Sequence, residues 1–349
     1  MVLDELRAPV VLAPLGGGPS TPELAAAVCE AGGLGFLASG YLSAAAAGER
    51  IAATRGLTDR PFGVNVFAPV PGPTDPAVYA GYVDRLAQWA RARGAQLGEP
   101  RHGDDDFEAK VELLARDPVA VVSFTFGCPP PEVLERLRAA GSEVWVTVTS
   151  PREAGRAAAA GADALVVQGG EAGGHRASFE DREDVPVHGL LALLQLVAAR
   201  LSLPLVASGG VATGGALAAV LAAGARAAQI GSAFMLCPEA GTSPAHRAAL
   251  ATDGETALTR AFSGRLARGI RNAFLDEHSE RAPVAYPEIH YVTAPVRRAA
   301  RESGDASAIN LWAGETHQLA REAPAAEVVG ELMREARAAS AAAAERLPG

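Results

Sequence analysis

The chain alternates short runs of β-branched and apolar residues with longer stretches rich in Ala and Leu. This alternation extends from Val10 to about Ser232, and it is typical of parallel strands joined by crossover helices. Eight runs are expected to be strands: Val10 to Pro14, Leu34 to Ser39, Phe62 to Phe67, Ala120 to Phe126, Glu143 to Val148, Ala164 to Gln168, Pro204 to Ser208 and Ala227 to Gly231. The pattern therefore predicts an α/β fold.

The ends of the intervening helices support these strand positions. The dipeptide Ala-Gly occurs at 31–32, 140–141, 160–161 and 223–224, each time shortly before an expected strand. Gly closes a helix in the left-handed conformation without a Cβ penalty. Eight strands with intervening helices favour a closed (β/α)8 TIM barrel over a doubly wound sheet.

The pattern changes after the eighth run. Arg-rich stretches through Arg268, expected to be helical, and a Pro-punctuated segment predict a smaller, mainly helical lobe over 234–308. The tail from Ile309 is expected to pack back on the barrel, which then comprises 1–233 and 309–349. Two connections are long, 68–119 with an expected helix at Pro76 to Gln96, and 169–203. Long connections after barrel strands usually carry function.

Composition narrows the possible partners and location. The formal charge is −9, and no Lys/Arg cluster is long enough to track a phosphate backbone, which argues against nucleic acid. Cys29, Cys128 and Cys237 are too widely spaced to suggest a disulfide framework or a metal site. The longest apolar helix, around Gly189 to Ala199, is too short for a bilayer. We expect a soluble, cytoplasmic protein with no membrane partner.

Glycines and amides follow the expected strands, at the end of a barrel where active sites lie. Gly209 and Gly210 follow the seventh strand and Gly231 ends the eighth, so backbone N–H groups there can close on an anion. A phosphorylated cofactor or substrate is expected. A single Gly-Gly pair, however, is more often only a turn.

Three neutral amides also stand at strand ends. Asn65, Gln168 and Gln229 offer donors and acceptors suited to the rim of a flat heterocycle such as an isoalloxazine. The alternative is structural, since Gln168 could cap a strand and Asn65 could be a buried turn amide.

His175 is the only one of seven histidines in a Gly-flanked turn directly after an expected strand. An imidazole with an ordinary pKa of about 6.5 exchanges protons at neutral pH, so His175 is the candidate catalytic residue. Alternatively it is hydrogen-bonded within its own loop and Glu171 is the base. Arg176 could fix the loop by an ion pair.

Other polar side chains are weaker candidates. Tyr286, His290 and Tyr291 lie in the Pro-bounded segment of the lobe, where they could face the substrate or be structural. The remaining histidines are expected on the surface, in a charged tract or on helices: His102, His188, His246, His278 and His317.

Several motifs together resemble the nitronate monooxygenase family, formerly called 2-nitropropane dioxygenases. They are Ala13-Pro14-Leu15-Gly16-Gly17, the run Gln168 to Arg176, Ser208-Gly209-Gly210-Val211, Gln229-Ile230-Gly231-Ser232, Thr21-Pro22-Glu23-Leu24 and Ile309-Asn310-Leu311-Trp312-Ala313-Gly314. The resemblance covers nearly the whole chain, and Glu171 to Arg176 is its most specific element.

The resemblance implies an FMN enzyme with His175 as the base. Cofactor contacts are expected from Leu15, Asn65, Gln168, Gly173, Gly174, Ser208, Gly209, Gly210, Gln229, Ile230, Gly231 and Ser232. In the family, a nitronate, or a nitroalkane deprotonated by the histidine, reduces FMN, and O2 completes oxidative denitrification to a carbonyl compound and nitrite. No nicotinamide is required.

The chain departs from the family at four places. It has Leu15 where Met is common, Ser208 for Ala, Ser232 for Thr, and Gly314-Glu315 for Gly-Gln. Leu15 is expected to border the flavin, and Glu315 adds a charge near the barrel tail. These changes bear on the substrate more than on the cofactor.

Three alternatives stay open on the sequence alone. A flavin enoyl-acyl-carrier-protein reductase of the related barrel type has a similar Glu-Ala-Gly-Gly-His element but takes hydride from NADH, as does an NADH:quinone reductase. A flavin-binding protein without catalysis is the third. A homodimer is possible in each case.

Overall fold

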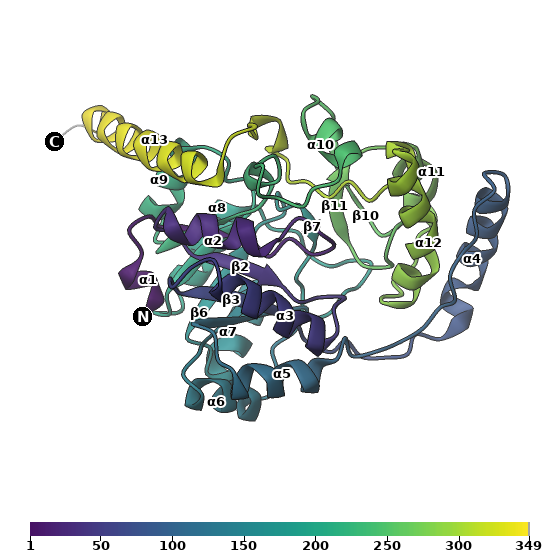
Figure 1. Cartoon of the computed structure of the whole chain (residues 1–349), viewed down its shortest axis with the longest axis horizontal. Coiled ribbons are helices and arrows are strands. Elements are labelled where there is room, and N and C mark those ends of the chain that lie inside the picture. Colours follow the sequence, from purple (N-terminus) through teal and green to yellow (C-terminus); the bar gives the residue numbers. More distant parts are fainter. Residues whose placement is uncertain (348–349) are drawn as a thin grey trace.

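The computed structural model describes residues 1–347 and shows a barrel of eight parallel strands (Figure 1). They are β1 (Val10–Leu12), β2 (Gly35–Ala38), β3 (Phe62–Phe67), β4 (Val121–Thr125), β5 (Glu143–Val148), β6 (Ala164–Gln168), β8 (Leu205–Ser208) and β9 (Ala227–Ile230). Their order is β1-β9-β8-β6-β5-β4-β3-β2, and a parallel bridge between Val11 and Leu34 joins β1 to β2. The eight expected strands and the (β/α)8 barrel are confirmed.

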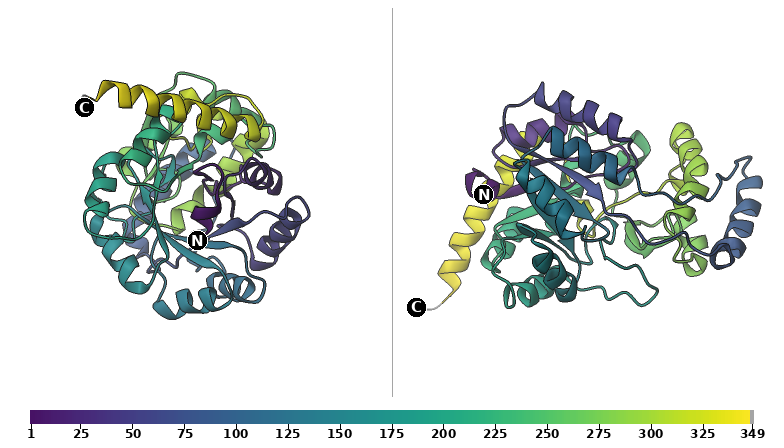
Figure 2. Two further views of the ribbon diagram at one scale, coloured as in Figure 1. Left: turned by 90° about the vertical axis from the view of Figure 1, so that its left-hand side faces the viewer. Right: turned by 90° about the horizontal axis from the view of Figure 1, so that it is seen from below.

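Helices surround the strands as a ring, seen end-on in the left view of Figure 2. They are α2 (Pro22–Glu30), α3 (Ala44–Arg55), α5 (Phe107–Arg116), α6 (Pro131–Ala139), α7 (Pro151–Ala160), α8 (Leu190–Ala198) and α9 (Gly214–Ala222). Ser or Thr oxygens cap the N-termini of α2, α3, α7 and α9. The Gly of each Ala-Gly pair has a φ between +95° and +106°, as the helix ends required.

Alternation along the strands separates two apolar cores. Outward-facing residues pack against the ring of helices. Inward-facing residues such as Phe36, Trp145 and Val206 fill the barrel together with Leu3 of α1 (Val2–Glu5). Because side chains fill this N-terminal end, a cavity can form only at the C-terminal ends of the strands.

The lobe beside that end contains strands as well as helices. β10 (Thr256–Thr259) and β11 (Ala267–Ile270) form an antiparallel sheet with β7 (Gly174–His175). The helices are α10 (Pro244–Leu250), α11 (Ala273–His278) and α12 (Glu288–Ser303), with short 3-10 turns at Ser232–Phe234, Ser279–Arg281, Ala306–Ala308 and His317–Leu319.

The helical expectation up to Arg268 was therefore wrong for β10 and β11. Arg268 is tolerated in a buried strand because its guanidinium donates to Gly170 O at 2.9 Å and pairs with Glu315 at 2.8 Å. In the sequence, a charged residue does not indicate a buried strand, because the partners that allow its burial are not visible there.

The lobe also packs against α4 (Pro76–Arg91), which ends earlier than the expected helix. Tyr79, Tyr82, Leu86 and Trp89 of α4 belong to the apolar core of the lobe, beside which α4 lies in Figure 1. A segment of the β3 connection thus contributes to the lobe. The limits of the lobe, 234–308, stay a prediction.

The tail packs back on the barrel as expected. α13 (Ala325–Arg346) lies against α9 and α2. The approach is close, since a Cβ on Gly214 would lie 2.3 Å from Glu335 Cβ. Within residues 1–347, no helix combines the length and the apolar character that crossing a bilayer requires.

Candidate functional site

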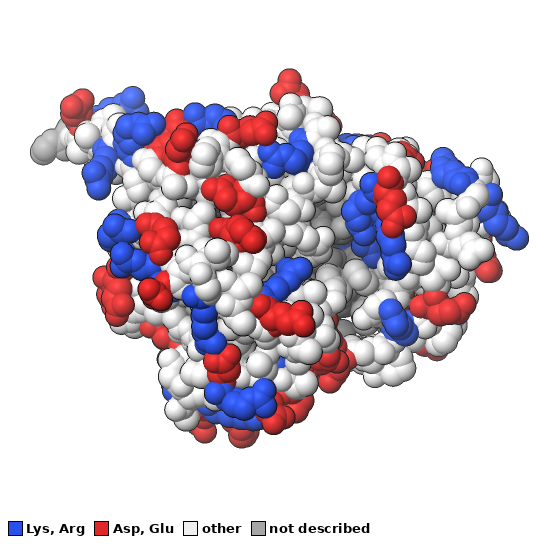
Figure 3. All heavy atoms as spheres, in the orientation of Figure 1, with Lys and Arg blue, Asp and Glu red and all other residues white. Residues whose placement is uncertain are grey.

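A cavity of about 500 Å³ opens at the C-terminal ends of the barrel strands. Its walls come from the barrel, from the lobe and from the tail, and Figure 3 shows the surface hollowed between barrel and lobe. Most residues expected at the site line it: Leu15, Asn65, Gln168, Gly173, Gly174, His175, Ser208, Gly209, Gly210, Gln229, Gly231, Ser232 and His290.

Three expected residues are not on the cavity wall. Ile230 points its side chain into the core between strands and helices, because it alternates with Gln229 along β9. Tyr286 does not line the cavity, and its ring lies 5.8 Å from that of His175. The Arg101 guanidinium lies over the ring of Tyr291, with its Cζ atom 4.1 Å from the ring centroid.

The glycines after β8 form a cradle of free backbone donors. Gly209 and Gly210 have φ values of +110° and +69°, and a Cβ on Gly209 would lie 2.9 Å from Ala172 N. Within residues 1–347, the N–H groups of Gly209, Gly210 and Ser232 donate to no protein acceptor. Such a cradle accommodates a phosphate group.

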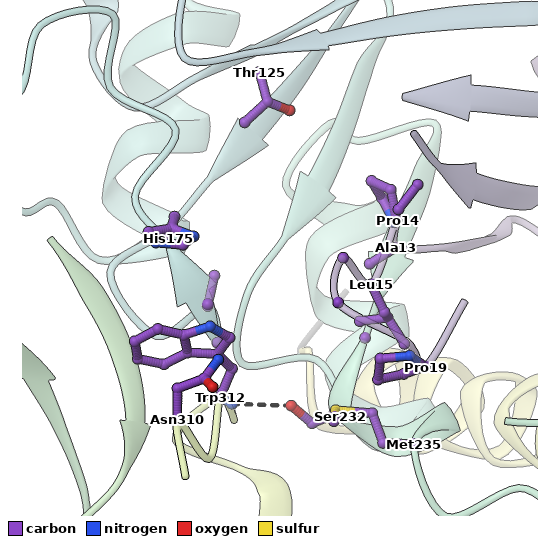
Figure 4. Close-up of a pocket in the computed structure, with 18 of the residues that line it drawn as sticks. Ala13, Pro14, Leu15, Pro19, Thr125, His175, Ser232, Met235, Asn310 and Trp312 are labelled. Carbon is purple, nitrogen blue, oxygen red and sulfur yellow. Dashed lines mark hydrogen bonds between the residues drawn. The ribbon is translucent and has the colours of Figure 1, made fainter. Parts of the chain in front are cut away.

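The loop after β6 is held by the barrel tail. A Cβ on Gly173 would lie 2.5 Å from both Ala313 C and Gly314 N, so only Gly fits there. Gly314 N–H donates to Ser232 Oγ at 2.9 Å, drawn as the dashed line in Figure 4, and Glu315 N–H donates to Glu171 O at 3.0 Å. The Gly-rich loop, the tail and the end of β9 therefore form one unit.

The three side-chain amides differ in their hydrogen bonds. Asn65 donates to the Ser123 and Thr125 hydroxyls, each at 2.9 Å. Gln168 spans the loop, donating to His175 O and accepting from Ala177 N–H at 2.9 Å. Gln229 differs, because its side-chain amide lines the cavity without a hydrogen bond to any residue in 1–347.

These features fit the flavin phosphate and ring. Gln229 offers an amide with free donors and acceptors for the edge of a heterocycle, and the glycine cradle offers N–H groups for a phosphate. His175 and Trp312 stand across the cavity from Leu15 and Ser232 (Figure 4). A flat cofactor between these two walls would expose one face to His175.

The side chains of Glu171 and Arg176 both stabilise the loop after β6. The Glu171 carboxylate accepts from Leu190 N–H at the start of α8, at 3.0 and 3.1 Å. Arg176 is 1% exposed and donates to the carbonyl oxygens of Gln168 and Gly169. Neither side chain lines the cavity. Arg176 thus fixes the loop through carbonyl groups rather than through the expected ion pair.

His175 projects into the cavity from β7. Its Nε2 lies 2.8 Å from Ser263 Oγ, and Phe126 and Trp312 contact the ring edge to face. Burial and the charges of Arg265 and Arg297 lower the pKa of His175 from 6.5 to about 3. The imidazole is therefore neutral at physiological pH, so one of its ring nitrogens carries no proton.

Aromatic residues at two strand ends were missed by the sequence analysis. Tyr41 and Phe126 follow β2 and β4, line the cavity and have φ values of +66° and +76°. Such backbone is strained for a bulky residue and is found most often at functional sites. The available signal was their position at the ends of expected strands, since Phe126 is the last residue of one and Tyr41 lies two residues after another.

The arginines of α12 were missed as well. Arg297, Arg298 and Arg301 line the cavity, and within residues 1–347 no Asp or Glu lines it. Figure 3 shows basic side chains along the lobe side of the hollow. In a chain with a formal charge of −9, a cavity with only positive charges favours anionic ligands.

Three histidines expected on the surface are buried. His278 is 0% exposed against aromatic rings, and His317 is 1% exposed and bonds the carbonyl groups of Leu250 and Gly254. His246 lines the cavity with Nε2 3.1 Å from Trp312 O. Packing between segments distant in sequence buries these three side chains, and the periodicity of the sequence does not indicate this burial. In residues 1–347, no group of three acidic, His or Cys side chains could hold a metal ion.

Known proteins resemble the chain over almost its full length. The family model described as nitronate monooxygenase matches residues 2–335. The chain is 42% identical to nitronate monooxygenase of Pseudomonas aeruginosa, over 95% of this chain and 97% of that protein.

Solved structures show the same similarity. The crystal structure of nitroalkane oxidase from Streptomyces ansochromogenes has a TM-score of 0.95 at 49% identity, over 98% of this chain and 99% of that one. FabK from Thermotoga maritima is more distant, with a TM-score of 0.78 at 25% identity, over 99% and 97%. The resemblance seen in the sequence is confirmed, and the chain belongs to the nitronate monooxygenase family of flavin-dependent oxidoreductases.

Proposed function

We propose that the protein binds FMN and oxidises nitronates with O2 to a carbonyl compound and nitrite, acting also on neutral nitroalkanes after deprotonation. The observation that carries this proposal is the neutral imidazole of His175, which faces a cavity with a phosphate cradle and no acidic residue. Propionate 3-nitronate and alkyl nitronates are the proposed substrates.

The cofactor would be held by residues already in place. The N–H groups of Gly209, Gly210 and Ser232 would bind the phosphate, and Gln229 would bind the ring edge. When bound, FMN supplies the electron acceptor for the substrate and passes electrons to O2. The other residues of the cavity bind and orient the substrate and move its proton.

Ser263 selects the nitrogen of His175 that acts as base. Its oxygen accepts from Arg265 N–H at 3.4 Å, and when its hydroxyl donates to Arg265 O at 3.2 Å the same oxygen also accepts from His175 Nε2–H at 2.8 Å. In this arrangement Nδ1 carries no proton, and it has no hydrogen-bond partner in residues 1–347. We therefore assign Nδ1 as the atom that takes the proton from the carbon next to the nitro group.

The substitution His175→Asn tests the assignment. The variant should keep its flavin, lose turnover of a neutral nitroalkane, and lose less on an anionic nitronate, which is already deprotonated. Stopped-flow flavin reduction with nitroethane and with ethyl nitronate measures both. Unchanged reduction by nitroethane would contradict the role of the base.

NADH-dependent reductases are the second candidate, and the comparisons do not favour them. The relatives of 42% and 49% identity are named a nitronate monooxygenase and a nitroalkane oxidase, whereas FabK shares 25%. A flavin protein without catalysis is disfavoured by the free Nδ1 of His175. Anaerobic mixing with NADH separates these functions.

A homodimer and a cytoplasmic location stay predictions. Light scattering after gel filtration tests the first, and cell fractionation tests the second.

A further inference from the structure

A second histidine, His290 on α12, lines the same cavity in a rigid setting. Its ring stacks on that of Tyr41, with centroids 4.1 Å apart and an interplanar angle of 2°. Tyr41 is itself fixed, because its N–H donates to Asp105 Oδ1 at 2.8 Å and its hydroxyl accepts from Tyr286 at 3.2 Å. The plane of the His290 imidazole is therefore set by its neighbours.

Arg297 determines where the proton of His290 resides. One Nη2 of Arg297 lies 2.7 Å from His290 O and 3.3 Å from His290 Nδ1. A guanidinium donates and cannot accept, so Nδ1 must be the acceptor and carries no proton. The proton of the neutral ring is then on Nε2.

The surrounding charges keep this ring neutral. Arg297 is 6% exposed and has no carboxylate partner in residues 1–347. Burial, Arg297 and His175, with smaller effects of Arg301 and Arg101, hold the pKa of His290 well below 6.5. The other titratable groups near the ring are the Tyr41, Tyr286 and Tyr291 phenols, none of which is a carboxylate.

The Nε2–H group has no acceptor among residues 1–347. His290 Nε2 forms no hydrogen bond with any residue in 1–347, and it is not among the side-chain atoms sealed from solvent. Since the described lining of the cavity contains no carboxylate, the acceptor for this donor is either water or a ligand that enters the cavity.

We propose that His290 is a substrate-binding residue that donates a hydrogen bond from neutral Nε2–H to an oxygen of the nitro group, with its tautomer fixed by Arg297. The inference rests on the proposed function. The two imidazoles then have different roles: His175 accepts a proton from the substrate, and His290 keeps its own proton.

The chemistry needs such a donor. When His175 Nδ1 takes the proton from the carbon, the electron pair of the C–H bond moves into the C–N bond and onto the nitro oxygens. A hydrogen bond to these oxygens strengthens as the negative charge develops, so it stabilises the nitronate more than the neutral nitroalkane. A neutral donor does this without giving up its proton.

The tautomer can be observed without measuring activity. In protein with 15N-labelled histidine, two-bond 1H–15N correlations should show His290 protonated at Nε2 and free at Nδ1, with no titration step near the ordinary histidine pKa of 6.5. In Arg297→Met, which removes the donor to Nδ1, the signals should shift towards the other tautomer. A wild-type His290 protonated at Nδ1 would overturn the inference.

Nitrate, a planar and unreactive oxyanion, probes the site in the FMN-loaded protein. Nitrate should shift the His290 Nε2 signal, and His290→Phe, which keeps the stacking on Tyr41, should weaken nitrate binding by about 10- to 100-fold. His290→Gln, which restores an N–H donor, should recover most of the affinity. His188→Phe is the matched control, because His188 is outside the cavity lining.

Turnover provides the second readout. The same variants should lower kcat/KM for nitroethane in the same order, with His290→Phe down by about 10- to 100-fold. A His290 signal that responds to FMN loading but not to nitrate, or equal nitrate affinity in wild type and His290→Phe, would overturn the inference. Failure of every nitro compound to reduce wild-type flavin would instead contradict the proposed function, while the nitrate titration would still report on the donor.

Discussion

Replacing Gly173 by Ala should loosen the flavin site without unfolding the barrel. The added Cβ would lie 2.5 Å from two backbone atoms of the tail, Ala313 C and Gly314 N. These are backbone atoms, so no flexible side chain can move aside. Either the loop shifts into the cavity, or the tail moves and loses the bond from Gly314 N–H to Ser232 Oγ.

The size of the effect follows from the contact. The atoms must separate by roughly 1 Å to reach ordinary contact distance, and overpacking of this kind costs about 1–3 kcal/mol. If the loop carries the strain, FMN affinity falls by roughly 5- to 150-fold, since about 1.4 kcal/mol is tenfold. Gly155→Ala is the matched control, because a Cβ there in α7 meets nothing within 4 Å and should stabilise the helix.

The assay is titration of the apoprotein with FMN, followed by quenching of flavin fluorescence, with thermal unfolding of the same samples. Gly173→Ala should bind FMN more weakly than wild type, and Gly155→Ala should bind it equally well. Wild-type FMN affinity in Gly173→Ala would refute the view that the loop and the tail form one unit at the flavin.

Three further predictions test other parts of the protein. Gly210→Asp should abolish flavin binding, because a carboxylate would repel the phosphate and φ is +69° there; a fully yellow variant would contradict the cradle. The pH profile of kcat/KM for nitroethane should lack an ascending limb near pH 6.5, because the pKa of His175 is lowered to about 3 and the neutral base persists on acidification; a limb at 6.5 would contradict this. Lys110→Met should destabilise the protein by about 3 kcal/mol or more in urea unfolding, because Lys110 is 1% exposed and pairs with Asp105 at 2.6 Å; no loss would show that the pair is dispensable.

Much of the barrel site could be predicted from local pattern. Strand ends converge at one edge in any such barrel, so placing Asn65, Gln168 and Gln229 at the ends of apolar runs also placed them together. Strict alternation would have excluded Ile230 as well, because neighbours on a strand face opposite sides.

The lobe side of the site could not be predicted in this way. Arg297 reaches the cavity only through the packing of α12, which no periodicity in the sequence shows. The positive φ of Tyr41 and Phe126 is contrary to the local preference of aromatic residues, so the sequence around them does not indicate it. The burial of His246 and His278 likewise depends on contacts distant in sequence.

The proposed function is tested by anaerobic mixing of the FMN-loaded protein with propionate 3-nitronate, with ethyl nitronate and with NADH, while the flavin absorbance is followed. The proposed function predicts rapid bleaching by at least one nitronate and little response to NADH. Rapid bleaching by NADH, with no response to either nitronate, would contradict it.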